Sequence, residues 1–344
     1  MRTGIVVAAG PGVEELAAEA ERLGHDSFWV YDTPLAQGDP FVALALCAKA
    51  TDRIRLGVGV TSPALRSVPA AANAFASLDA LAPGRIICGV GTGNSSRRTA
   101  GMRPTTAAEL EDFTRSLQDL CGGRSTEYRE GDQVRDIRFL RAGTPGPITF
   151  VVAAQGLKAA AVAGRRGTGL MSFAIPDPAA WSAFHNARRT AARSAGVPVT
   201  GDSYLMTSLH VLAEGEDPHG DAARDATGHS VLSFLVFAAD TPSFAEVLGV
   251  EEREAVRRLL DRRGTTSGAP DRYTALYNGY LARVAPADRD LVLPSLMDEL
   301  ALVGRPGELR ARIAALAAAG VDEVVVQPVV DPVAEMAAFA ELTA

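Results

Sequence analysis

Residues 68–93 read VPAAANAFASLDALAPGRIICGVGTG, and this stretch holds one complete unit of the fold. The sequence predicts a helix over Val68–Leu81, which a Pro-Gly pair closes. The apolar run Ile86–Val90 then predicts a strand, and a glycine-rich turn follows it. A helix followed at once by a buried strand is the repeating unit of α/β proteins, so this stretch indicates that fold class.

The same unit recurs in both directions from this stretch. The predicted strands cover residues 4–9, 27–31, 55–60, 86–90, 148–153, 169–172, 203–213 and 323–327. The predicted helices cover residues 13–23, 40–50, 68–81, 105–120, 157–165, 178–195, 306–319 and 332–342. Eight strand–helix units with right-handed crossovers predict a closed (β/α)8 TIM barrel. The alternative is an open doubly wound sheet, which usually has fewer strands.

Two segments interrupt this rhythm, and both are predicted to be insertions into one barrel domain that spans residues 1–344. The first, about 123–147, is polar and rich in glycine and proline, with candidate hairpin strands at 126–128 and 136–140. The second, about 214–303, shows no clear strand pattern and lies between strands 7 and 8. It is predicted to be helical, with helices at 221–237, 251–262 and 272–284 among others.

Composition argues against several classes of protein. The chain has 34 Lys plus Arg against 41 Asp plus Glu and a net charge of −7, whereas a nucleic-acid-binding protein normally carries a basic face. Cys47, Cys88 and Cys121 have no metal-ligand spacing, so we expect no metal site. Sparse thiols fit a reducing cytoplasm. No stretch approaches the ~20 apolar residues of a membrane span.

The barrel rule places functional groups in the loops that follow the strands. The residues expected there are small or polar: Asp32, Gly59–Ser62, Gly91–Ser96, Ala154–Gly156 and Ser172. Such residues offer hydrogen bonds and backbone contacts, so they suit a large, flat ligand better than a metal ion. Alternate glycines over 89–93 let a backbone approach a ligand, although tight packing at a strand end explains them as well. The turn before helix 157–165 is either an anion site or a simple turn.

Several stretches of the chain resemble the bacterial luciferase-like superfamily of flavin-dependent monooxygenases and deazaflavin-dependent reductases. They cover residues 28–32, 56–63, 76–85, 89–93, 303–306 and 319–323. The stretch 76–85 with 89–93 is the most specific of these. Among the branches, the third- and fourth-strand segments look most similar to methylenetetrahydromethanopterin reductase-like proteins.

The resemblance implies a cofactor, either FMN or coenzyme F420. It places a non-prolyl cis peptide bond at Gly59-Val60, behind the cofactor ring. It also places a phosphate-binding loop at residues 154–156. The cofactor-binding residues predicted in this way are Gly59, Val60, Thr61, Thr92, Gly93, Asn94, Ala154, Gln155, Gly156 and Ser172.

The chain departs from the family pattern where proton transfer is expected. Many relatives have histidine after the acidic residue of the second strand, and this chain has Thr33. Where deazaflavin sugar dehydrogenases have an acidic residue after the fourth strand, this chain has Asn94. Neither side chain has a pKa suited to acid–base work near neutral pH. Asp32 and His210 are therefore the catalytic candidates, with substrate or water as alternatives.

Two reactions are compatible with the resemblance. One is hydride transfer between coenzyme F420 and a small organic substrate. The other is monooxygenation with reduced FMN from a partner flavin reductase and oxygen. The helical insertion, with Tyr273, Tyr277 and Tyr280, is expected to cover the pocket, although a packing face explains the tyrosine spacing equally well. The resemblance also implies a homodimer.

Two other classes of function stay open at this stage. The missing histidine is compatible with a non-catalytic flavin-binding or ligand-binding protein on the same barrel. An unrelated phosphate-handling barrel, such as an isomerase, would need a clear acid–base pair at the strand ends, and the sequence shows none.

Overall fold

Eight parallel strands close into a barrel in the computed structural model, which describes residues 1–140, 146–265, 269 and 271–343. The strands pair in sequence order, and β8–β9, β9–β11 and β11–β1 pairings complete the ring. They are β1 (Arg2–Val7), β2 (Ser27–Val30), β3 (Arg55–Thr61), β4 (Ile86–Val90), β7 (Thr149–Ala153), β8 (Gly169–Phe173), β9 (Ser203–Val211) and β11 (Glu323–Val326). The predicted (β/α)8 barrel is confirmed, and the open-sheet alternative is wrong.

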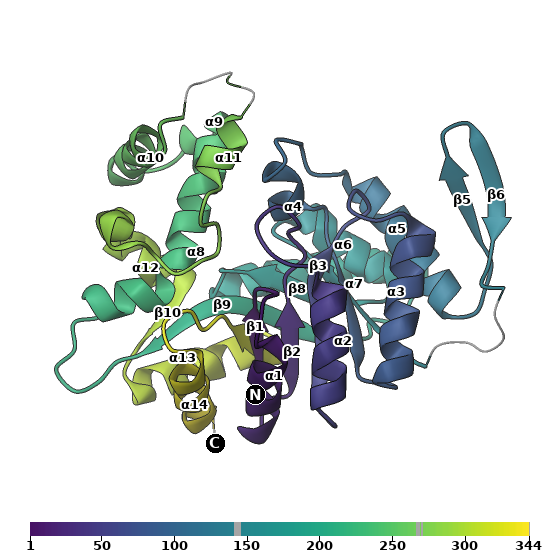
Figure 1. Ribbon diagram of the computed structural model, residues 1–344, viewed down its shortest axis with the longest axis horizontal. Coiled ribbons are helices and arrows are strands. Elements are labelled where there is room, and N and C mark those ends of the chain that lie inside the picture. Colours follow the sequence, from purple (N-terminus) through teal and green to yellow (C-terminus); the bar gives the residue numbers. More distant parts are fainter. Residues whose placement is uncertain (141–145, 266–268, 270, 344) are drawn as a thin grey trace.

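Helices surround this barrel (Figure 1). They are α1 (Val13–Arg22), α2 (Pro40–Ala50), α3 (Val68–Leu81), α4 (Asn94–Arg98), α5 (Ala107–Cys121), α6 (Leu157–Arg166), α7 (Pro178–Ala195), α13 (Pro306–Ala318) and α14 (Pro332–Thr343). Their starts follow local signals, since the Asp39 and Asp177 side chains accept hydrogen bonds from first-turn N–H groups. Thr106 and Glu109 form a capping box at α5. The short helix α4 lies in the loop after β4 and was not predicted.

The first insertion is the expected hairpin, with shifted strands. Its strands are β5 (Thr126–Glu130) and β6 (Gln133–Ile137), which pair antiparallel around Gly131. The predicted second strand, 136–140, starts too late because the turn needs only two residues, and the first of them, Gly131, has φ of 56°. Residues 141–145 of the predicted insertion lie outside the described residues.

The second insertion is helical, as predicted. It contains α8 (Asp221–Asp240), α9 (Pro242–Ala245), α10 (Val250–Arg262), α11 (Arg272–Leu276), the 3-10 turn η1 (Pro286–Leu291) and α12 (Pro294–Leu300). The predicted helix 272–284 is wrong beyond Leu276, because Gly279 and Leu281 adopt left-handed backbone angles there. Residues 266–268 and 270 lie outside the described residues.

The expectation that 214–303 has no strand is also wrong. β10 (Ala301–Gly304) pairs with the second half of β9, at Ser208–Val211, whereas the first half of β9 pairs with β11. The long strand β9 therefore leaves the barrel and joins the insertion to it. Figure 1 shows the helical insertion on one side of the barrel and the hairpin on the other.

Three apolar clusters form the core. One lies between the barrel and its helices, and a second lies within the insertion. The third fills the barrel and consists of Val6, Trp29, Tyr31, Ile87, Val151, Met171, Tyr204, Met206 and Val325. Trp29 and Tyr204 meet edge to face, with ring centroids 5.2 Å apart. The barrel interior is therefore packed, and a ligand must bind at one of its ends.

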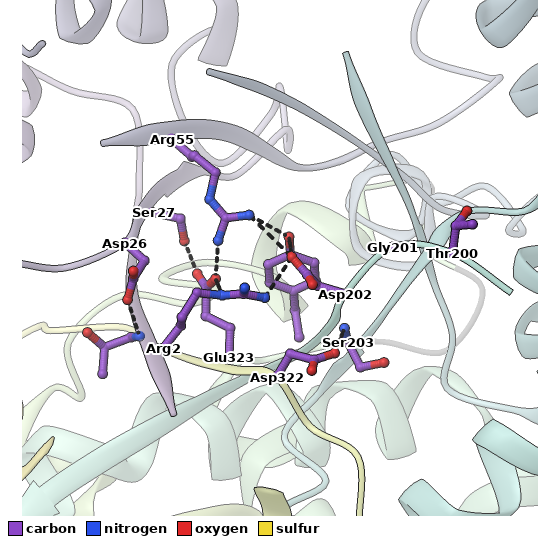
Figure 2. A network of polar contacts seen from close by, with 12 residues as sticks. Arg2, Asp26, Ser27, Arg55, Thr200, Gly201, Asp202, Ser203, Asp322 and Glu323 are labelled. Carbon is purple, nitrogen blue, oxygen red and sulfur yellow. Dashed lines mark hydrogen bonds and ion pairs between the residues drawn. The ribbon is translucent and has the colours of Figure 1, made fainter. Parts of the chain in front are cut away.

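A polar network closes the end where the strands begin (Figure 2). Glu323 is fully buried there, and its Oε2 lies 2.5 Å from Arg55 Nη2. Arg2 Nη2 lies 2.6 Å from Asp202 Oδ2, and Ser27 donates a hydrogen bond to Glu323. Because these groups satisfy one another, we interpret this end as structural. The opposite end, where the strands finish, is the candidate site.

Candidate functional site

Strand β3 contains a bulge at Gly59-Val60, where the peptide bond is cis. The cis bond that the family resemblance implied is therefore confirmed. Val58 pairs with Cys88 and Thr61 with Val90, so two residues of β3 face Gly89 alone. A Cβ atom on Gly89 would lie 2.2 Å from the Val58 oxygen. This close approach explains why the sequence has glycine at that point.

The loop after β4 is held tightly around two glycines. A Cβ on Gly91 would lie 2.8 Å from Val60 Cγ2, and one on Gly93 would lie 2.7 Å from Ser62 Oγ. Gly93 also has φ of 76°, a conformation that glycine adopts readily. The glycine pattern of the sequence therefore has a packing cause. It also brings the Ser62 and Ser96 hydroxyls to the same glycine.

Asp32 follows β2 and is 2% exposed. Neither of its carboxylate oxygens has a hydrogen-bond partner among the described residues, and Arg66 Nη2 lies 3.7 Å from Oδ1. Burial raises the pKa of Asp32, and the Thr61 hydroxyl and the Arg66 guanidinium oppose that rise only in part. The carboxyl group therefore keeps its proton to a higher pH than an ordinary aspartate does.

Unsatisfied polar groups gather at this end of the barrel. Buried polar side chains normally have hydrogen-bond partners, so each exception calls for an explanation. Five buried side chains at the strand ends or in the loops that follow have a polar atom with no hydrogen-bond partner among the described residues: Asp32, Thr61, Ser62, Ser96 and Ser172. Gln37 Oε1 and Arg66 Nε, on half-buried residues of the same loops, also have none. The five buried groups are four hydroxyls and one carboxyl group. This set fits the polar edge of a flavin-like ring.

The loop after β7 leads into the open N-terminus of α6. Ala154 donates its N–H to the oxygen of Met171 on β8, which places the loop beside Ser172. Gly156 begins α6 without a side-chain cap, and a Cβ atom there would meet nothing within 4 Å. Gln155 and Gly156 are exposed. Since no side chain occupies this position, a phosphate group fits there.

The structure does not bring His210 together with the other predicted residues. His210 Nε2 lies 2.7 Å from Glu216 Oε1, in the loop that follows β9. Its strand position belongs to the part of β9 that pairs with β10, beyond the barrel. Its catalytic role stays a prediction, and the geometry gives it no support.

Two residues that the sequence analysis did not single out lie at the barrel mouth, which is the end of the barrel where the strands finish. The Tyr31 hydroxyl donates to Gln327 Oε1 at 3.0 Å, and Gln327 Nε2 donates to the Leu281 oxygen at 2.7 Å. In the sequence, Tyr31 and Gln327 are predicted only as the last residues of their strands. The strand-end rule would have found Gln327, because it directly follows the last residue of β11. No sequence signal shows that these residues meet.

The insertion contacts the loop after β4. Tyr280 shares a hydrogen bond with Ser95, with the two oxygens 2.8 Å apart. Arg98 Nη1 lies 2.8 Å from Asp240 Oδ2 of α8, and Arg98 Nε donates to Asn94 Oδ1 at 2.8 Å. The Tyr277 hydroxyl also donates to Asp240. The insertion therefore covers this side of the site, as expected.

Among the described residues, no group of three or more histidine, cysteine or acidic side chains could hold a metal ion. No helix in the same residues is long and apolar enough to cross a bilayer.

Comparison with known proteins identifies the class. The family described as luciferase-like monooxygenase matches residues 8–323. The chain belongs to this family, and it is therefore an enzyme of the oxidoreductase class.

Particular relatives extend this result. An F420-dependent hydroxymycolic acid dehydrogenase of Mycobacterium tuberculosis is 30% identical over 258 residues, which cover 71% of this chain and 69% of that protein. A 5,10-methylenetetrahydromethanopterin reductase of Archaeoglobus fulgidus is 25% identical over 317 residues, which cover 91% of this chain and 88% of that protein. The similarity to the reductase branch expected from the sequence is thus confirmed.

Solved structures agree with the fold. An F420-dependent secondary alcohol dehydrogenase, solved with an F420-acetone adduct, superposes with a TM-score of 0.71. It is 19% identical, and the superposition covers 99% of this chain and 98% of that one. At this identity the similarity concerns the fold alone.

Proposed function

We propose that this protein is a coenzyme F420-dependent oxidoreductase that acts on a small organic substrate. The observation that carries the proposal is the set of buried, unpartnered polar groups around the Gly59-Val60 bulge. The relative named as an F420-dependent hydroxymycolic acid dehydrogenase supports F420 over FMN. The enzymatic proposal also replaces the non-catalytic alternative.

The predicted residues would hold the cofactor in two groups. The ring would lie at Gly59, Val60, Thr61 and Gly93, with the Ser62 and Ser96 hydroxyls at its polar edge. The phosphate would lie at residues 154–156 and Ser172. When bound, the cofactor supplies a carbon that accepts or donates a hydride. The chain itself supplies orientation and excludes water.

Asp32 is the acidic side chain among the buried polar groups that would surround the ring, so it is the candidate for proton transfer. It is buried, neither of its carboxylate oxygens accepts a hydrogen bond from a described residue, Arg66 Nη2 lies 3.7 Å away, and burial raises its pKa. A protonated carboxyl group can donate a hydrogen bond to the bound cofactor or its substrate. We therefore assign this donor role to Asp32 and none to His210.

The second candidate is monooxygenation with FMN. The description of the matching family favours it. In that case a partner flavin reductase would supply the reduced cofactor. The homodimer and the cytoplasmic location stay predictions from the sequence.

Equilibrium titration of the protein with F420 and with FMN tests the proposal. We expect F420 to bind at least tenfold more tightly than FMN. A Ser62→Ala/Ser96→Ala variant should bind F420 more weakly, because it removes two hydroxyls from the ring edge. Ser182→Ala, on the exposed face of α7, is the matched control. Tighter binding of FMN would favour the second candidate, and failure of both cofactors would refute the proposal.

A further inference from the structure

A chain of hydrogen bonds at the barrel mouth joins three distant parts of the sequence. Tyr31 follows β2, Gln327 follows β11, and Leu281 belongs to the helical insertion. The Tyr31 hydroxyl donates to the Gln327 amide oxygen, and the Gln327 amide nitrogen donates to the Leu281 main-chain oxygen. Tyr31 and Gln327 are only 7% and 5% exposed. The insertion thus reaches the mouth with a carbonyl group.

Leu281 also places its side chain at the mouth. The isobutyl group packs against the apolar cluster that fills the barrel, as do Val60 and Phe173. Leu281 has φ of 59°, a left-handed conformation that is disfavoured for a residue with a Cβ atom. Contacts with the mouth must therefore hold it in place. Leu281 presents a carbonyl oxygen with an aliphatic group beside it, which is the chemistry of a small ketone.

The pair of Tyr31 and Gln327 has hydrogen-bonding capacity left over. A phenol can donate one hydrogen bond and also accept, and a glutamine amide has two N–H groups. After the two internal bonds, the Tyr31 oxygen can still accept and Gln327 keeps one N–H. Withdrawal of Leu281 would free the second N–H. A hydroxyl or carbonyl oxygen can use these groups directly.

The charges at the mouth argue against an anionic substrate. Arg66 lies 2.7 Å from Asp39 and 3.7 Å from Asp32. Arg98 is paired with Asp240 at 2.8 Å. Arg66 and Arg98 are therefore neutralised by carboxylates, whereas Arg97 of α4 donates a hydrogen bond to the Arg103 main-chain oxygen. A phosphate or carboxylate group that binds Arg66 or Arg98 would have to compete with their carboxylate partners.

We propose that Tyr31 and Gln327 bind the oxygen of a neutral alcohol or carbonyl substrate, and that Leu281 occupies this place until the substrate displaces it. This inference rests on the proposed function for the reaction, but the binding site stands on its own contacts. Leu281 is then the residue that limits the size of the aliphatic part of the substrate.

Three probes of similar shape separate the possibilities: 4-methyl-2-pentanone, 4-methyl-2-pentanol and 3-methylbutanoate. Their dissociation constants would be measured by ligand-observed NMR, with the protein alone and with the protein saturated with F420. We expect the ketone and the alcohol to bind at least tenfold more tightly than the carboxylate. We also expect the Leu281 methyl resonances to shift when the ketone binds.

Variants test the residues directly. Gln327→Met should weaken ketone binding about tenfold, and Tyr31→Phe should weaken it about fivefold, because each loses a hydrogen bond. Leu281→Gly keeps the main-chain oxygen but removes the isobutyl group from the mouth, so it should strengthen ketone binding by making room for the aliphatic part of the ketone. Gln133→Met and Tyr128→Phe, in the hairpin, are matched controls.

Equal binding of the carboxylate and the ketone would overturn the inference, as would an unchanged Leu281 resonance. Equal effects of Gln327→Met and Gln133→Met would also overturn it. If a variant fails to fold, the wild-type probes and the Leu281 resonances still decide. Failure of F420 to bind, with ketone binding intact, would refute the proposed function alone.

Discussion

Asp32 shows how burial at a strand end changes a carboxyl group. Its pKa is raised in the folded protein, so the folded state holds the proton more tightly than the unfolded state does. Stability conferred by the protonated form is therefore lost as pH rises from the ordinary aspartate pKa of about 3.9 through the raised value. Above that window, the ionised carboxylate lies buried at a cost.

The Asp32→Asn variant tests this effect. Asparagine mimics the protonated acid, so the variant should gain stability relative to the wild type as pH rises from 4 to 8. Thermal denaturation of both proteins across this range provides the measurement. The opposite trend, with the variant losing stability at pH 8, would show that the Arg66 pair dominates and that the carboxylate is ionised.

Gly156 tests the phosphate position. A Cβ atom at this position meets nothing within 4 Å in the free chain, and the backbone is extended. Gly156→Ala should therefore change the free energy of unfolding by less than about 0.5 kcal/mol. It should nevertheless weaken cofactor binding roughly tenfold, because the methyl group would crowd the phosphate.

Gly307→Ala, in α13, is the control, since a Cβ there also meets open space. Unfolding curves and cofactor titrations of the two variants provide the comparison. Normal cofactor affinity in Gly156→Ala would place the phosphate elsewhere.

Among the structural elements, the polar network at the start of the strands should stabilise the fold without contributing to cofactor binding. Glu323 joins β11 to Arg55 of β3 and to Ser27 of β2. Glu323→Gln removes one partner of a buried ion pair, so it should destabilise the fold by about 3 kcal/mol. Cofactor affinity should stay unchanged, because this network lies at the opposite end of the barrel. Urea denaturation and titration of the variant check both halves; a loss of affinity in folded protein would contradict this division.

The contact between the insertion and α4 predicts a measurable local effect. Tyr280→Phe removes the hydrogen bond to Ser95, which is worth about 1 kcal/mol. The amides of residues 277–282 should then exchange with solvent about fivefold faster, with global stability nearly unchanged. Hydrogen exchange measured by mass spectrometry tests this. Tyr128→Phe is the control, and equal exchange in both variants would argue that Ser95 does not anchor the insertion.

Local patterns explain which elements could be predicted. The bounds predicted for helix α3 and strand β4 are those of the structure. Apolar periodicity marks each element, and the Pro-Gly pair between them separates the end of the helix from the start of the strand. Strand β10 was missed because it follows α12 without any turn residue between them. The helix predicted over 272–284 was too long, since Leu281 adopts a left-handed conformation that only tertiary contacts enforce.

Some residues of the candidate site could be predicted from the sequence, and others could not. Gly93, Gly156 and Asp32 follow strands, so the barrel rule found them. The hydrogen bond between Tyr31 and Gln327 joins residues 296 positions apart, and no local pattern encodes it. His210 was a candidate because it lies inside the predicted seventh strand, and β9 does include it. In the structure, that part of β9 pairs outside the barrel.

In the whole molecule, the two ends of one barrel have opposite tasks. One end is closed by a network of ion pairs (Figure 2), and the other end has buried polar groups without hydrogen-bond partners among the described residues. The helical insertion covers the second end and contributes Leu281 to it. We propose that the cofactor binds at the end of the barrel where the strands finish.

Hydrogen exchange of the protein with and without saturating F420 shows at which end the cofactor binds. We expect protection of residues 59–62, 91–96 and 153–158, with no change at the strand starts around Arg55 and Asp202. Protection confined to the strand starts or to the outer helices, with the three loops unchanged, would contradict it.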